Sequence, residues 1–210
     1  LLLFLSIILG GIYDIFGKKI LGSDFILGAG FFFLCLFGAS TYSNKFTIIT
    51  LVICFLYFFH IIFNNAVEGG LKDVYHDHLA GAKTTATRLG VRLKEGKPLV
   101  TKTFQVFAYI FTIIFSGLIF LLIYNQIYNL WLDSFSFHMI IVGLLSLILF
   151  GTLYKFLHLP KFDRSKLKRL FSAYEITSYL MLLIALSPML SLGIIVSLFI
   201  IPSSCYLISN

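Results

Sequence analysis

The stretch FTIITLVICFLYFFHIIFNNA, residues 46–66, decides the fold class, because it carries no Asp, Glu, Lys or Arg and is long enough to cross a bilayer as a helix. The whole 210-residue chain has the same character: 59% of its residues are hydrophobic and 12% are charged, against roughly 45–50% and 25% in soluble proteins. Within lipid every backbone N–H and C=O group must be hydrogen-bonded within the protein, which leaves helices and closed β-barrels. This run lacks the alternation of apolar and polar residues that barrel strands show, so it predicts a helix. The sequence therefore predicts an all-α, polytopic transmembrane helix bundle in a lipid bilayer.

Outward from this run, further apolar stretches predict about six to seven spans of a larger bundle. The last stretch would measure about 52 Å as one helix, too long for one crossing, and SPMLSLG (Ser187–Gly193) offers a turn that would divide it into two short spans. The first stretch lacks a signal-peptide leader, so we expect it to be the tail of a span whose beginning is missing. We expect one membrane domain over residues 1–210. The candidate spans are Leu1–Ile12, Leu21–Ser40, Phe46–Ala66, Thr103–Tyr124, Phe137–Leu157 and Tyr174–Ile208.

The basic residues give the chain a net charge of +7 and occur in blocks: Lys18 and Lys19, seven residues from Lys72 to Lys102, and six from Lys155 to Arg169. The other connections, TYSNKF and NQIYNLWLDSFS, hold one lysine and none. This alternation predicts that the basic connections face the cytoplasm, and it explains the positive charge by topology and lipid head groups rather than by nucleic acid. The three cysteines have no partner spacing and predict neither a disulfide nor a metal site; they are Cys35, Cys54 and Cys205.

The connection at residues 67–102 is the one whose length and composition predict a functional loop. It places Asp73 and Asp77 four residues apart, so a helix that continued beyond the lipid would carry both carboxylates on one face. Their repulsion would be roughly 3 kcal/mol at about 6 Å and an effective dielectric constant of about 20. Mg²⁺ fits such a sparse pair, because it is held by one or two carboxylates together with substrate phosphates. Zinc fits less well, because His76 and His78 cannot both share that face.

Cations surround the acidic pair, and a polyanion between them and a metal ion would explain the arrangement. The alternative is a solvated helix end whose carboxylates form salt bridges with Lys72, Lys83 or Arg88. Gly81 permits the helix to end, and Thr84 or the following threonine suits the cap of a next helix whose N-terminus would favour a phosphate.

The pattern N-x-x-E-G-x-x-K-D-x-x-x-D-x-x-x-G-x-x-T-x-x-x-x-L-G, from Asn65 to Gly90, resembles the second aspartate-rich motif of the UbiA-type membrane prenyltransferases. YDIFGK resembles the Y-x-x-x-x-K of an earlier helix in that family. The resemblance implies a cavity, open to the cytoplasm and the bilayer, in which Mg²⁺ and basic residues hold the diphosphate of a polyprenyl donor. By this resemblance Asp73 and Asp77 would bind Mg²⁺ as the catalytic pair. The residues near the diphosphate would be Tyr13, Lys18, Lys72 and Arg88.

The resemblance implies transfer of the polyprenyl group to a lipophilic acceptor, either an aromatic quinone precursor or a glyceryl phosphate of an ether lipid. Glu68 would orient the acceptor or form a helix-end salt bridge. The family's first motif, N-D-x-x-D-x-x-x-D, is absent, and Asp14 and Asp24 share no helical face that would replace it. We therefore expect an N-terminally incomplete chain that lacks half of the metal site and is inactive alone. The alternatives are a transporter subunit that uses the Asp pair for a cation or proton, and a structural fragment without activity.

Overall fold

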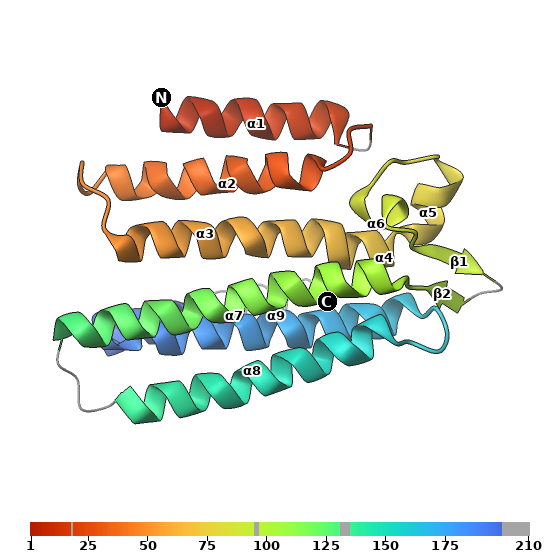
Figure 1. Cartoon of the computed structure of the whole chain (residues 1–210). Helices are drawn as coiled ribbons and strands as arrows, with labels where there is room; N and C mark the ends of the chain where they lie inside the picture. The colour runs from red at the N-terminus through yellow and green to blue at the C-terminus, as the bar shows by residue number, and fades with distance from the viewer. Residues whose placement is uncertain (18, 95–96, 131–134, 199–210) are drawn as a thin grey trace.

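The structure is a computed structural model, which describes residues 1–17, 19–94, 97–130 and 135–198; for residues 94, 126–130, 135 and 136 it describes the backbone alone. Six long helices run roughly antiparallel to one another in this part of the chain (Figure 1). α1 packs on α2, α2 on α3 and α3 on α7, and α7, α8 and α9 pack together. Their bounds are α1 Leu2–Phe16, α2 Ser23–Ser40, α3 Ile48–Phe63, α7 Lys102–Leu130, α8 Phe135–Leu157 and α9 Arg164–Leu186.

Five helical segments in the described part of the chain are long and apolar enough to cross a membrane, and the predicted all-α membrane bundle is confirmed. They are Ser23–Ser40, Ile48–Lys72, Lys102–Asn125, Phe137–Leu157 and Arg164–Met189. α1 is also apolar but only 15 residues long. Large apolar side chains remain exposed along the outer faces of the bundle, as expected for a protein whose surrounding solvent is lipid.

The bounds of the last span were predicted wrongly, because α9 begins at Arg164, within the basic block, rather than at Tyr174. Asp163 caps this helix by accepting a hydrogen bond of 3.1 Å from the backbone N–H of Lys166. Leu167 and Tyr174, two turns apart, are both buried on the inward face, while long basic side chains extend to the surface. α9 ends at Leu186 and a 3₁₀ turn follows at Ser187–Met189, at the predicted break. Most of the remaining stretch, from 199 to 208, lies outside the described residues.

A close approach of α2 and α3 depends on Gly28. A Cβ at this position would lie 2.9 Å from Cγ1 of Ile62 and 3.1 Å from the carbonyl oxygen of Phe58, so a larger residue would separate the two helices. Ile62 is fully buried, and it belongs to a core that continues through α7 to α9. Cys54 is also buried, and it and Cys35 are free thiols; Cys205 lies outside the described residues.

Beyond α3 the chain remains helical but changes its geometry. A π-helical turn η1 (Asn64–Gly69) leads into the short helix α4 (Gly70–Lys72), and α5 (Val74–Leu79) follows after a break at Asp73. The one-turn helix α6 (Thr85–Arg88) comes next. The two strands that follow, β1 (Arg92–Lys94) and β2 (Lys97–Leu99), form an antiparallel hairpin that the sequence analysis did not predict. The predicted functional loop is therefore a folded unit.

The connections rich in basic residues gather at one end of the bundle. Figure 1 shows the α1–α2 connection, the segment from α4 to β2 and the α8–α9 connection at the right, and the α2–α3 connection at the left. This arrangement is what alternating connections predict. The segment from α4 to β2 thus lies beside the α1–α2 connection, which brings residues 13–24 and 65–84 together.

Candidate functional site

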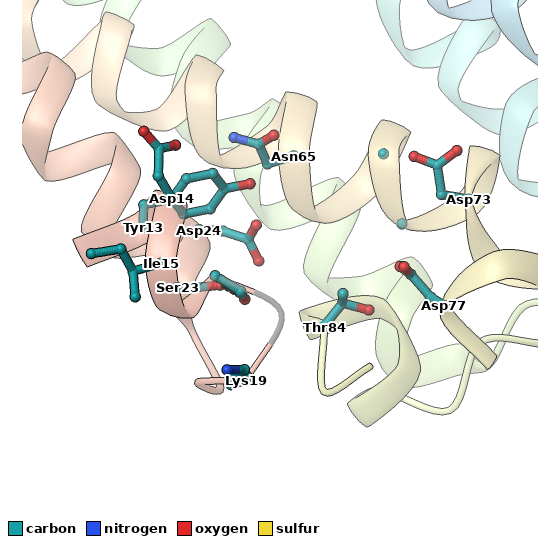
Figure 2. A pocket seen from close by; sticks show the side chains of 13 residues that line it. Tyr13, Asp14, Ile15, Lys19, Ser23, Asp24, Asn65, Asp73, Asp77 and Thr84 are labelled. Carbon is teal, nitrogen blue, oxygen red and sulfur yellow. Dashed lines mark hydrogen bonds between the residues drawn. The ribbon is translucent and has the colours of Figure 1, made fainter. Parts of the chain in front are cut away.

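A cavity of about 460 Å³ lies at the basic end of the bundle, between the α1–α2 connection and the segment from η1 to α6. Figure 2 shows side chains from both segments directed toward the space between them. Four of the residues that line it are carboxylates, and Lys19 contributes a positive charge. The lining residues are Tyr13, Asp14, Ile15, Gly17, Lys19, Ser23, Asp24, Asn65, Gly69, Gly70, Asp73, Asp77 and Thr84.

The predicted acidic pair lies on this cavity wall. The expected uninterrupted helix is absent, because Asp73 adopts φ −103° and ψ 8° between α4 and α5. The backbone nonetheless keeps the helical spacing, since the N–H of Asp77 donates to the carbonyl of Asp73 at 2.9 Å. Asp77 is 4% exposed, and both side chains line the cavity. The spacing therefore places two carboxylates on one wall, as predicted, although through a broken helix.

The cation beside Asp73 is Arg164, at the start of α9. Nη2 of Arg164 donates to Oδ1 of Asp73 at 3.0 Å. The alternative of a solvated helix end named Lys72, Lys83 or Arg88 as salt-bridge partners of the acidic pair, and for Asp73 the partner is Arg164 instead. Arg164 belongs to the basic block that was assigned to topology alone, so the sequence offered no signal for this contact over 91 residues.

Of the four predicted diphosphate-binding residues, two do not line the cavity and one lies outside the described residues. Lys72 pairs with Glu68 one turn back, at 3.1 Å, so the predicted helix-end salt bridge of Glu68 is present. Arg88 is exposed at the end of α6 and does not line the cavity. Lys18 lies outside the described residues. Of the three predicted residues that the structure describes, only Tyr13 lines the cavity.

Tyr13 lies near the end of α1, outside the five spans. Burial is the main cause that raises the pKa of its phenol, and the cavity carboxylates of Asp24, Asp14 and Asp77 raise this pKa further. The phenol therefore stays protonated at neutral pH and serves as a hydrogen-bond donor on an otherwise acidic wall.

Asp14 and Asp24 were missed as site residues. They share no helical face, but the short α1–α2 connection turns the chain so that both line the cavity. Asp24 is 6% exposed, and its Oδ2 accepts a hydrogen bond of 2.5 Å from the hydroxyl of Thr85. The sequence did contain a signal for them, because both aspartates stand beside a short basic connection at the end of the bundle where the cavity lies.

The donor set tests whether a metal ion fits. No three His, Cys, Asp or Glu side chains within residues 1–17, 19–94, 97–130 and 135–198 lie close enough to hold an ion by themselves. His76 and His78 are exposed. Two carboxylates on one wall suit Mg²⁺ when the remaining ligands are water and the oxygens of a bound phosphate. The wall therefore fits an ion shared with a phosphate ligand, not one enclosed by protein.

The helix that carries Asp77 ends near Gly81, where the sequence predicted its end. α5 stops at Leu79, and Gly81 adopts the left-handed φ of 62°. Thr84 caps α6, because its hydroxyl oxygen accepts from the backbone N–H of Thr87 at 3.4 Å. α6 is a single turn, however, which is too short for the predicted phosphate site at its N-terminus.

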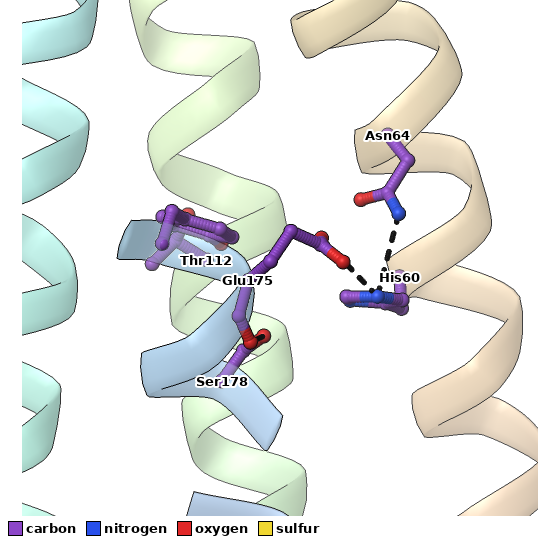
Figure 3. Close-up of polar contacts among 6 residues, drawn as sticks. His60, Asn64, Thr112, Glu175 and Ser178 are labelled. Atoms are coloured by element: carbon purple, nitrogen blue, oxygen red, sulfur yellow. Dashed lines mark hydrogen bonds and ion pairs between the residues drawn. The ribbon is translucent and has the colours of Figure 1, made fainter. Parts of the chain in front are cut away.

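A second polar cluster lies near the middle of two candidate spans, among residues that do not line the cavity. Nε2 of His60 on α3 lies 3.3 Å from Oε1 of Glu175 on α9, and 3.4 Å from Nδ2 of Asn64 (Figure 3). Beside it the hydroxyls of Thr112 and Tyr174 share a hydrogen bond of 2.9 Å. This contact between His60 and Glu175 was not predicted, because a single glutamate within an apolar stretch does not identify its partner.

Comparisons of the chain with protein-family models, with curated proteins and with solved structures found no match. The functional interpretation therefore rests on the motif resemblance and on the geometry of the cavity.

Proposed function

We propose that the chain is the membrane domain, or part of it, of a prenyltransferase that transfers a polyprenyl group from its diphosphate to a lipophilic acceptor. The observation that supports this most directly is that Tyr13, Asp73 and Asp77 line the same cavity. These residues come from two separate motifs, and the resemblance requires them to meet at one diphosphate site. The acceptor is an aromatic quinone precursor or a glyceryl phosphate.

In this proposal Asp73 and Asp77 would hold Mg²⁺ together with the diphosphate, and when bound it would supply positive charge against the charge that develops on the departing diphosphate. The protonated phenol of Tyr13 donates a hydrogen bond to a phosphate oxygen. Lys19, which lines the same cavity, supplies a positive charge in place of Lys72 and Arg88. The basic end of the bundle, and with it the cavity, faces the cytoplasm. Both lipophilic substrates reach the cavity from the bilayer.

The first test is binding by the whole chain in lipid nanodiscs, with radiolabelled geranylgeranyl diphosphate in Mg²⁺ or in EDTA. We expect binding that requires Mg²⁺ and weakens at least about tenfold in Asp73→Asn and Asp77→Asn, since each substitution removes a charged ligand. Asp163→Asn is the matched control, because it removes a carboxylate at the same end of the bundle while asparagine keeps the cap of α9. Equal binding by wild type and both variants would contradict the site.

Transfer of the label to an aromatic quinone precursor or to the glyceryl phosphate of an ether lipid, offered in turn, then identifies the acceptor class. Asp73→Ala and Asp77→Ala should abolish the transfer to either acceptor.

One observation favours the alternative of a transporter subunit. Ionisable side chains near the middle of a membrane often mark ion or proton pathways, and His60 and Glu175 form such a pair. This function predicts proton flux into proteoliposomes that carry a pH-sensitive dye inside, and loss of that flux in Glu175→Gln. The prenyltransferase predicts no flux above that of empty vesicles.

A further inference from the structure

The buried hydrogen bond between Asp24 and Thr85 joins α2 to the folded loop over 61 residues of sequence. We propose that Asp24 is a positioning residue: its carboxylate holds Thr85, and with it α6, in the place that keeps Thr84 and Asp77 on the cavity wall. The consequence for ligand binding rests on the proposed function, whereas the consequence for loop structure does not.

Asp24 is the fixed partner of this bond. It is the second residue of α2, where the free backbone N–H groups of the first turn favour a carboxylate. Ser23, beside it, donates from its hydroxyl to the carbonyl of Gly17 at 2.6 Å and so secures the α1–α2 connection. Both Asp24 and Thr85 are less than 10% exposed, at 6% and 7%, and a buried carboxylate needs hydrogen bonds that replace those of water.

The neighbouring residue of α6, Ala86, packs against α4. A Cβ at Gly70 would lie 2.3 Å from Cβ of Ala86, so the two backbones approach as closely as a glycine permits. This apolar contact presses α6 onto α4 but does not determine how α6 is rotated. The rotation of α6 is determined by a directional hydrogen bond, which is the bond from Thr85 to Asp24.

Two further hydrogen bonds carry the position of α6 to Asp77. The hydroxyl of Thr87 donates to the carbonyl of Ala82 at 2.9 Å, and the N–H of Ala82 donates to the carbonyl of Asp77 at 2.9 Å. A rotation of α6 would therefore disturb the end of the helix that carries Asp77. Thr84, next to Thr85, would leave the cavity wall at the same time.

A direct role for Asp24 is the rival explanation, since its side chain also lines the cavity. In that role its negative charge would act on a bound cation. The two roles differ in the effect of Asp24→Asn, which removes the charge but keeps an oxygen that accepts from Thr85. Asp24→Ala removes both, and Thr85→Val removes the donor while it leaves Asp24 in place.

The test is hydrogen–deuterium exchange of residues 80–91 of the whole chain in nanodiscs, which needs no ligand. We expect exchange about tenfold faster in Asp24→Ala and in Thr85→Val, and no faster still in the double variant, since both changes remove the same bond. Asp24→Asn and Thr85→Ser should stay within about twofold of wild type, because each keeps the bond. Unchanged exchange in both Asp24→Ala and Thr85→Val would overturn the proposal.

The second readout is Mg²⁺-dependent binding of geranylgeranyl diphosphate. Affinity should fall about five- to tenfold in Thr85→Val, a residue that does not line the cavity, and should stay near that of wild type in Thr85→Ser, which keeps the bond to Asp24. A loss in Asp24→Asn as large as that in Asp24→Ala would overturn the positioning role. If wild type binds no diphosphate, the proposed function fails, while the exchange rates still decide the role of Asp24.

Discussion

Arg164 and Asp73 lie 91 residues apart in the sequence, and the guanidinium of one contacts the carboxylate of the other at 3.0 Å. The contact joins the start of α9 to the break between α4 and α5. The two side chains are 51% and 36% exposed, so solvent screens their attraction. The contact is therefore weak enough for a metal ion to replace it.

Arg164→Gln should tighten Mg²⁺ binding, because the ion and the guanidinium compete for Oδ1 of Asp73. Exposed ion pairs contribute about 0.2–1 kcal/mol, so the half-saturating Mg²⁺ concentration for diphosphate binding should fall by up to about fivefold. Titration of Mg²⁺ at a fixed concentration of labelled diphosphate measures this. Lys166→Gln, which removes a positive charge from the same turn, is the control, and a rise in the Mg²⁺ requirement specific to Arg164→Gln would contradict the competition.

Glu175→Leu should destabilise the bundle by about 0.6 kcal/mol and by no more than about 1.7 kcal/mol, the average and the maximum measured for interhelical hydrogen bonds in a membrane protein. The substitution leaves His60 without its partner on α9. The double variant with His60→Phe should recover most of this loss, since neither polar group then remains. Unfolding in mixed micelles with increasing SDS measures both changes, and strictly additive losses would show that the two residues do not interact.

Gly28→Ala should cost about 1–3 kcal/mol, as expected for overpacking a tight helix contact. The added methyl group would lie 2.9 Å from Cγ1 of Ile62 and would push α2 away from α3. Gly38→Ala, on the same helix, is the matched control, because a Cβ there has no neighbour within 4 Å. The same unfolding assay should separate the two variants; equal stability would mean that the helices adjust without cost.

The basic end of the bundle should face the cytoplasm. With the native cysteines replaced by alanine, a cysteine at Lys97 should resist a membrane-impermeant maleimide in intact cells and react after permeabilisation. A cysteine at Ser43, in the α2–α3 connection, should react in intact cells. The reverse pattern would invert the orientation expected from the distribution of lysine and arginine.

The sequence predicts the membrane helices well because long apolar runs have few other solutions in lipid. The prediction fails where the chain is no longer a long apolar run. Hydropathy begins the last span at Tyr174, whereas the cap at Asp163 and the buried Leu167 extend α9 by ten residues. The hairpin formed by β1 and β2 escaped prediction because its strands are three residues each, too short for any pattern to identify them.

The site could be predicted only as far as local spacing reaches. Asp73 and Asp77 follow from helical spacing, and Tyr13 follows from the resemblance of YDIFGK. The contributions of Asp24 and Arg164 depend on where helices distant in sequence pack, which no local pattern records.

The π-helical turn Asn64–Gly69 has a consequence for insertions and deletions. Its hydrogen bonds span five residues instead of four, so it absorbs one residue more than an α-helical turn would. Each residue of an α-helix advances the direction of the side chains by about 100°. A chain one residue shorter between 64 and 69 would relax to an ordinary turn and keep Asp73 and Asp77 in phase with the cavity. The same deletion in α3 would rotate both carboxylates away from the cavity. The π-helical turn is therefore where the loss of one residue leaves the two carboxylates in place.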